Sequence, residues 1–172
     1  MGSSNRISIV SVSVCFWFLC YSCCSFWIAL FSQQRHFFCY SPLCFCVSSG
    51  YYVNLLRVRG SGLLSRHRHP GPVHGHVLKG KWKYLEHDWV AEQGSYIFEP
   101  PGEVHTLVVP DGVDEMITLF HVTGSLLYCD PDGKVVGAED VFTKLELAKK
   151  HYKAVGLGED FVQQFVLSLI HI

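Results

Sequence analysis

The stretch GLLSRHRHPGPVHGHVLKG, residues 62–80, crowds four histidines around one Pro-Gly-Pro corner. Residues two apart in a β-strand point to the same face, so His67 and His69 present two imidazoles side by side. Such a pair is a two-ligand edge for a divalent metal. Because the corner reverses the chain, the returning strand can lay His74 or His76 beside the pair. The sequence therefore predicts a metal site here.

A second cluster of turn residues follows the first stretch. Gly94 is followed after five residues by Pro100, then by Gly102, and two residues later by His105. Glycine and proline at this spacing indicate a tight turn. We expect this turn to deliver His105 from another strand toward the same interior.

Short strands surround both clusters. Their apolar residues alternate with period two and are separated by Gly and Pro, which is typical of an antiparallel sandwich or barrel. The predicted strands are YYVNLLRVRG (51–60), LLSRHRH (63–69), VHGHVLKG (73–80), two short strands within residues 81–94, SYIFEP (95–100), EVHTLVVP (103–110), EMITLFHVTG (115–124) and the hairpin SLLYCDPDGKVV (125–136).

The hydrophobic period changes after Val136. Residues 138–156 carry early acids at Glu139 and Asp140, late lysines and a stopping glycine at Gly156. These are signals for an amphipathic helix. The apolar positions of that helix are Val141, Leu145, Leu147, Ala148 and Tyr152.

The first 49 residues differ in composition from the rest. Residues 1–50 contain no Asp, Glu or Lys and hold seven of the eight cysteines. Residues 7–31 are uncharged and long enough to span a bilayer. Three interpretations stay open: a membrane anchor, a secretory signal, or translated sequence that is not native protein. The cysteine spacing supports neither a metal site nor a disulfide framework.

Four segments follow from these patterns. Residues 1–49 form the apolar Cys/Phe/Ser-rich segment, residues 50–137 the barrel, and residues 138–166 a helical C-terminal part. Residues 167–172, LSLIHI, follow a helical pattern with no cap or turn signal. We interpret them as a non-native tail and expect the domain to be cut near Val166.

Residues 62–80 resemble the first motif of the cupin family, which has a glycine, His-X-His, a fourth ligand position after four residues, and a closing glycine. Residues 94–105 match the second motif, GX5PXGX2H. Two features depart from the first motif: the leading glycine lies one residue closer to its histidine, and His74 stands where glutamate is usual.

The sequence between and after the motifs resembles that of the group of cupins that contains 2,4'-dihydroxyacetophenone dioxygenase and ChrR-like relatives. The similarity covers about residues 50–166 and implies an all-β, cupin-type antiparallel jelly-roll barrel with a C-terminal α-helical segment. Members of the group carry further strands before residue 50, so we expect a missing edge here.

The resemblance implies a mononuclear non-haem iron(II) centre held by His67, His69 and His105, with His74 as fourth ligand or as a neighbouring hydrogen-bond donor. Zinc or another divalent metal is an alternative occupant. The implied reaction is cleavage of a carbon-carbon bond of a small aromatic α-hydroxyketone by O2, in the degradation of aromatic compounds. Glu99 and Glu103 are the candidate catalytic acids and bases.

Other functions are weighed against this enzyme. A zinc-binding regulatory domain, as in anti-sigma factors, needs the same histidines, and an inactive fragment would follow from altered ends. The basic residues between 57 and 83 accompany no nucleic-acid motif, and the net charge is −1, so we expect no nucleic-acid partner. By analogy, cupins pair as homodimers or larger homo-oligomers. The protein is expected to be cytoplasmic, or membrane-anchored if residues 7–31 form an anchor.

Overall fold

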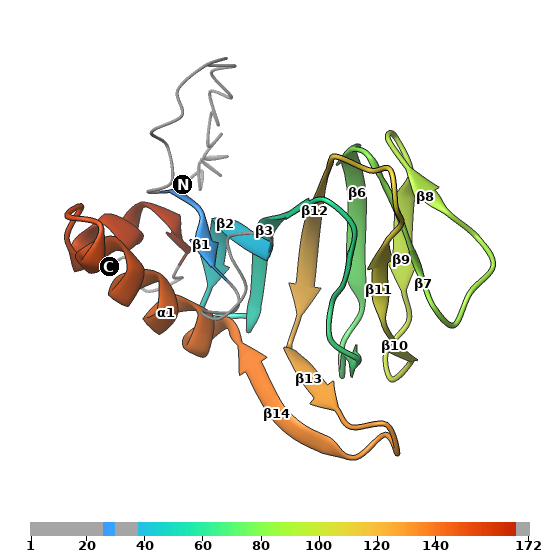
Figure 1. The fold of residues 1–172 in the computed structure, drawn as a ribbon. Helices are drawn as coiled ribbons and strands as arrows, with labels where there is room; N and C mark the ends of the chain where they lie inside the picture. The colour runs from blue at the N-terminus through green and yellow to red at the C-terminus, as the bar shows by residue number, and fades with distance from the viewer. Residues whose placement is uncertain (1–25, 30–37, 168–172) are drawn as a thin grey trace, which may run out of the picture.

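The computed structural model describes residues 26–29 and 38–167. Most elements are strands, and the helical elements lie near the C-terminal end (Figure 1). In chain order they are β1 (Ile28–Ala29), β2 (Phe38–Cys46), β3 (Tyr51–Arg59), β4 (Gly62–Leu63), β5 (His67–Arg68), β6 (Val73–Lys79), β7 (Lys81–Tyr84), β8 (Ala91–Glu92), β9 (Tyr96–Glu99), β10 (Val104–His105), β11 (Leu107–Val109), β12 (Glu115–Thr123), β13 (Ser125–Cys129), β14 (Val135–Asp140), α1 (Val141–Ala154), the 3₁₀ helix η2 (Glu159–Phe165) and β15 (Val166–Leu167).

The largest sheet has seven strands, in the order β1-β2-β3-β12-β6-β9, with β15 paired to β2. Strands β3 and β12 pair antiparallel over nine positions, from Tyr51 opposite Thr123 to Arg59 opposite Glu115. Burial alternates along both strands. Because the side-chain period of a strand is two, every second residue of these strands, such as Leu56, Met116 and Phe120, reaches one interior face. The prediction of antiparallel strands is confirmed.

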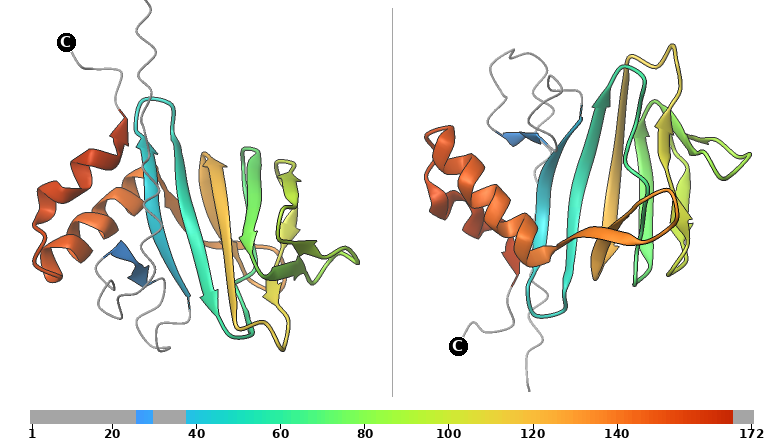
Figure 2. Two further views of the ribbon diagram at one scale, coloured as in Figure 1. Left: turned by 90° about the horizontal axis from the view of Figure 1, so that it is seen from above. Right: turned by 60° about the horizontal axis from the view of Figure 1, so that its bottom comes forward.

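Two further four-stranded sheets complete the barrel, with the orders β10-β5-β13-β14 and β4-β11-β7-β8. Trp82 and Leu107 of the second of these sheets belong to the same buried cluster as Phe120 of the large sheet. Figure 2 shows the strands from two further directions, with the helices at one end of the sheet. The expected all-β fold with a short C-terminal helical part is confirmed.

The predicted strand at residues 63–69 is two strands in two sheets. Strand β4 pairs with β11, whereas β5 pairs with β10 and β13. The backbone N–H of Leu64 donates to the carbonyl of Leu107, and that of Cys129 donates to the carbonyl of Arg66. The chain therefore changes sheets between these residues, and the change brings His67 beside strand β10.

Strand β2 lies before the domain boundary predicted at residue 50. It pairs with β3 from Phe38–Val58 to Cys46–Tyr51. Tyr40 and Phe45 are each only 1% exposed. The composition of residues 1–49 suggested a separate segment, but residues 38–46 form a strand of the large sheet, next to β3.

The membrane and signal interpretations of residues 7–31 fall almost wholly outside the described residues. Within residues 26–29 and 38–167, no helix is long and apolar enough to cross a membrane. Of the suspected tail, Leu167 lies in β15, and residues 168–172 are outside the described part of the chain.

Helix α1 begins and ends with the chemistry that the sequence indicated. Asp140 is the N-cap residue: its carboxylate accepts from the backbone N–H groups of Phe142 and Thr143. At the other end, the N–H of Leu157 donates to Tyr152 and that of Gly156 to Lys153, a Schellman arrangement that requires the positive φ of 83° at Gly156.

One apolar position of the predicted helix is exposed. Leu147 is 41% exposed, whereas Val141, Ala148 and Tyr152 are buried. Lys144 shares their face and is only 4% exposed. The helix therefore turns one lysine inward, toward the sheet.

Candidate metal centre

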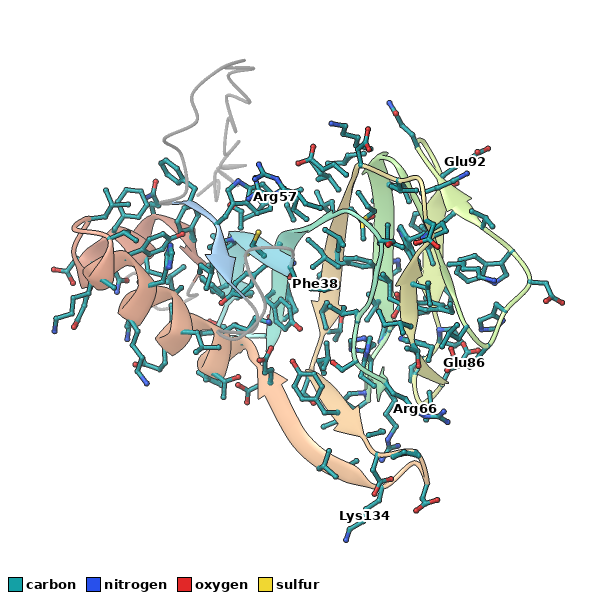
Figure 3. The ribbon with its side chains drawn as sticks, viewed as in Figure 1. Phe38, Arg57, Arg66, Glu86, Glu92 and Lys134 are labelled. Carbon is teal, nitrogen blue, oxygen red and sulfur yellow. The ribbon has the colours of Figure 1, made fainter. Side chains whose placement is uncertain are left out.

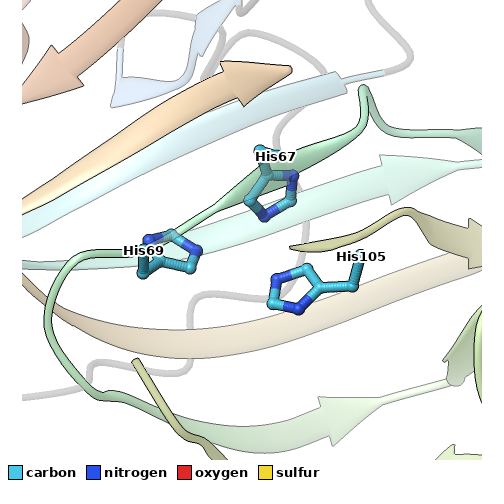
Figure 4. A group of neighbouring side chains, drawn as sticks. All are labelled: His67, His69 and His105. Carbon is cyan, nitrogen blue, oxygen red and sulfur yellow. The ribbon is translucent and has the colours of Figure 1, made fainter. Parts of the chain in front are cut away.

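Three histidines from both predicted clusters meet inside the barrel. His105 of β10 lies opposite His67 of β5 in the strand register, and His69 follows β5 directly. One ligand nitrogen from each of the three side chains lies within 4.8 Å of the others. The residues are 4%, 4% and 1% exposed for His67, His69 and His105. Figure 4 shows the three rings directed at one another.

A backbone hydrogen bond joins the two motifs. The N–H of Gly102, at the turn before β10, donates to the carbonyl of His69 at 2.8 Å. Gly102 has a φ of 88°, a conformation that side-chain-bearing residues rarely adopt. The glycine of the second motif therefore positions the turn that carries His105 to the other two histidines.

Hydrogen bonds to Nδ1 determine which nitrogens are available to a metal. Nδ1–H of His67 donates to the carbonyl of Ser65 at 2.6 Å, and Nδ1–H of His69 donates to the carbonyl of Ser125 at 3.1 Å. A donating Nδ1 leaves the lone pair on Nε2, as is usual for metal-binding histidines. Both nitrogens of His105 are buried and have no hydrogen-bond partner among the described residues.

Burial also keeps these rings uncharged. It lowers the pKa of His67, lowers that of His69 to about 3 and lowers that of His105 to about 2. Neutral imidazole is the form that binds metals. Three converging neutral imidazoles, one of them otherwise unsatisfied, fit a divalent transition metal; iron, zinc and copper all accept this donor set.

Glu99 is the candidate acid that the structure brings to the histidines. Its Oε2 lies 3.6 Å from Nε2 of His69 and 3.4 Å from Nε2 of His105. Its Oε1 accepts a hydrogen bond from the Tyr84 hydroxyl, and the Tyr84 ring stacks on His105 with 4.0 Å between centroids. Burial raises the pKa of Glu99 to about 7.

Glu103 and His74 lie away from this group. Oε1 of Glu103 is 2.6 Å from Nε2 of His87, and both side chains are about one-third exposed. His74 is one residue beyond Val73, which is buried and lines the interior. Because successive residues of a strand face opposite ways, His74 points to the outer face, where its Nδ1 lies 2.6 Å from the Tyr96 hydroxyl. The structure therefore does not bring His74 to the three histidines.

A cavity of about 70 Å³ adjoins the histidines. Its lining includes His67, His69, Val73, Tyr84 and Glu99, and also a second group that consists of Tyr40, Tyr52, Asn54, Tyr128, Glu139 and Lys144. This second group was not predicted from the sequence. One signal was present: Lys144 follows Val141 by three residues and precedes Ala148 by four, so it lies on the apolar stripe of the helix.

Comparisons with known proteins agree with this fold. No curated protein matches the sequence. An RmlC-like cupin protein from Ralstonia eutropha JMP134 superposes with a TM-score of 0.67 at 27% identity, over 74% of this chain and 82% of that one. Acetylacetone dioxygenase from Acinetobacter johnsonii superposes with a TM-score of 0.64 at 17% identity, over 78% and 92% of the two chains.

A comparison of the sequence with protein families also gives a cupin relative. Residues 31–127, more than half of the chain, match the family of ChrR cupin-like domains. That range includes β2 and the three histidines described above. The chain therefore belongs to the ChrR cupin-like domain family.

Proposed function

We propose that the protein is a mononuclear non-haem iron(II) dioxygenase that cleaves a carbon-carbon bond of an α-hydroxyketone, such as 2,4'-dihydroxyacetophenone. The observation that carries the proposal is the buried, neutral group His67, His69 and His105 beside an interior cavity. A bound iron(II) ion would supply the positions and the redox chemistry for O2 and two substrate oxygens. Both atoms of O2 would enter the products, 4-hydroxybenzoate and formate.

The protein side chains would divide the remaining tasks. The three histidines would hold the metal through nitrogen, with two of the rings oriented by the carbonyls of Ser65 and Ser125. Glu99 has one buried oxygen without a hydrogen-bond partner in the described part of the chain, and burial raises its pKa to about 7. It is suited to accept the proton of the substrate hydroxyl near neutral pH, while Tyr84 holds its other oxygen.

The size of the cavity bears on the substrate. Its 70 Å³ is about half the volume of an engineered apolar cavity that binds benzene, roughly 150 Å³. A small aliphatic ketone would need less movement of the lining side chains than an aromatic one. The structural likeness to acetylacetone dioxygenase supports including a β-diketone among the tested substrates.

Oxygen uptake by the full chain tests the proposal. The protein is loaded anaerobically with iron(II), bound metal is quantified, and uptake is measured with 2,4'-dihydroxyacetophenone, with acetylacetone and without substrate. We expect one O2 consumed per ketone cleaved, and for the first substrate equal amounts of the two products. Full iron occupancy without uptake on either ketone would contradict the proposal.

A zinc-holding regulatory domain is the second candidate, because the matching family is that of ChrR cupin-like domains. The same three histidines would bind zinc, which binds such sites more tightly than iron(II). Zinc retained through purification, together with no uptake by the iron-loaded protein, would favour this second function.

A further inference from the structure

A buried ion pair lies in the cavity that adjoins the histidines. Nζ of Lys144 lies 2.6 Å from Oε2 of Glu139, and the two side chains are only 6% and 18% exposed. The ammonium group also lies 4.3 Å from the centre of the Tyr40 ring. Figure 1 shows β14, which carries Glu139, running directly into α1, which carries Lys144.

Further hydrogen-bonding groups surround this pair. The Tyr40 hydroxyl is buried without a hydrogen-bond partner among the described residues, and Tyr40 lines the cavity. The Tyr128 side chain hydrogen-bonds to Glu139. Tyr128 lies opposite His67 in the register of β13 and β5, so the polar group and the histidines border one cavity.

The chemistry of this group selects among ligands. Taking two charges out of water is costly, and an ion pair repays that cost best when its remaining donors and acceptors are used. Lys144 and Tyr40 can donate hydrogen bonds, while the carboxylate of Glu139 can accept them. A carboxylate entering here would meet the negative charge of Glu139, whereas a hydroxyl group both donates and accepts.

We propose that the Glu139–Lys144 pair recognises a hydroxyl group at the end of the substrate that is distal to the metal. The carboxylate of Glu139 accepts a hydrogen bond from that hydroxyl, and Lys144 or Tyr40 donates a hydrogen bond to the hydroxyl oxygen. The inference rests on the proposed function for the idea that a ketone occupies this cavity. It adds the residues that recognise the distal hydroxyl and predicts that ketones bearing that hydroxyl are bound in preference to ketones without it.

The test compares two probes that differ only in this group, 4'-hydroxyacetophenone and acetophenone. Their dissociation constants are measured by calorimetry with the zinc-loaded full chain, so no turnover is needed. Because hydrogen bonds to charged groups are strong, we expect 4'-hydroxyacetophenone to bind about 10–100-fold more tightly. Equal binding of the two probes, or no binding of 4'-hydroxyacetophenone, would overturn the proposal.

Two variants test whether the ion pair causes the preference for 4'-hydroxyacetophenone. Lys144→Met keeps the length of the side chain and removes its charge, and Glu139→Gln keeps a polar side chain at the same position. In each we expect weaker binding of 4'-hydroxyacetophenone and a change of less than about twofold for acetophenone. A merely structural role would weaken both probes alike, and that result would also overturn the proposal.

The matched control is Lys149→Met, on the same helix. Lys149 pairs with Glu146 at the surface rather than lining the cavity, so both probes should bind as they do to the unchanged protein. The binding test is independent of oxygen uptake. Hydroxyl preference without uptake would refute the dioxygenase proposal alone, whereas uptake without hydroxyl preference would refute the inference about the ion pair alone.

Discussion

In the described part of the chain, two groups of histidines lie on the two faces of the barrel wall, and they differ in burial. His67, His69 and His105 are buried, and each has its pKa lowered by burial. On the outer face, the ring of His74 stacks on that of His121 with 5.9 Å between centroids, and His76 is exposed. The comparison shows that the face of the strand on which a histidine lies, rather than its residue type, decides which histidines converge.

Removing a histidine from each group should have opposite results for metal binding. His105→Ala is expected to abolish stoichiometric metal binding, because it removes one of three donors. His74→Ala is expected to bind one metal ion as the unchanged protein does. Metal content after dialysis, measured by atomic emission, compares the two variants. If His74→Ala lost its metal and His105→Ala kept it, the assignment of the two faces would be reversed.

A second pair of variants compares the interior and the surface through tryptophan. Trp82 is 0% exposed, and its Nε1–H donates to Oγ1 of Thr118 at 2.9 Å, whereas Trp89 is 40% exposed. Trp82→Ala should lower the free energy of unfolding by about 3–5 kcal/mol, and Trp89→Ala should lower it by less. Urea unfolding followed by circular dichroism gives both values. Equal losses would show that the packing around β7 is not the stabilising contact described.

Two tyrosine hydroxyls allow the inner and outer faces to be compared through single hydrogen bonds. The Tyr84 hydroxyl donates to Glu99 inside the barrel, and the Tyr96 hydroxyl lies 2.6 Å from Nδ1 of His74 outside it. Tyr84→Phe removes the hydrogen bond that holds Glu99 and should lower substrate-dependent oxygen uptake by about tenfold. Tyr96→Phe serves as the matched control and should leave the uptake unchanged. Oxygen uptake by the two iron-loaded variants measures the difference.

The smallest effect is expected at the N-cap of α1. Asp140→Ala should cost about 1 kcal/mol of stability, because two backbone N–H groups lose their acceptor. Hydrogen bonds from the backbone and side chain of Thr143 and from the backbone of Phe142 lower the pKa of Asp140 below its ordinary value of 3.8. The contribution of Asp140 is therefore fully present above about pH 4 and is lost as the pH falls through the lowered value.

Unfolding measured across the acid range tests this sign. The difference in stability between the unchanged protein and Asp140→Ala should be constant near neutral pH and should shrink only below pH 4. A difference that shrank on the alkaline side would mean that another group caps the helix.

Parts of the site could be predicted because their signals are local. The His-X-His spacing places His67 and His69 on one face, and the glycine and proline spacing before His105 indicates the turn that delivers it. His74 could not be placed from its spacing. The residues of the Pro-Gly-Pro corner decide which side chain of the returning strand faces inward, and a shift of one residue reverses the face. Val73 faces inward instead.

Other parts depended on contacts between distant residues. The composition of residues 1–49 concealed β2, whose role becomes visible only through its pairing with β3. Lys144 looked like any helical lysine, yet it is buried against Tyr40, more than one hundred residues earlier in the chain. Figure 3 shows side chains from separate strands in the space between the sheets, and no local sequence pattern describes this packing.

Alone, the amino-acid sequence determined the strand periodicity, the two turns that carry the histidines, and the start and end of the helix, because each depends on residues a few positions apart. The tertiary structure decided which histidine remains outside, that Glu99 rather than Glu103 joins the inner group, and that Lys144 and Glu139 line the cavity. Those outcomes depend on the registers between strands and on burial, which arise only when distant segments pack together.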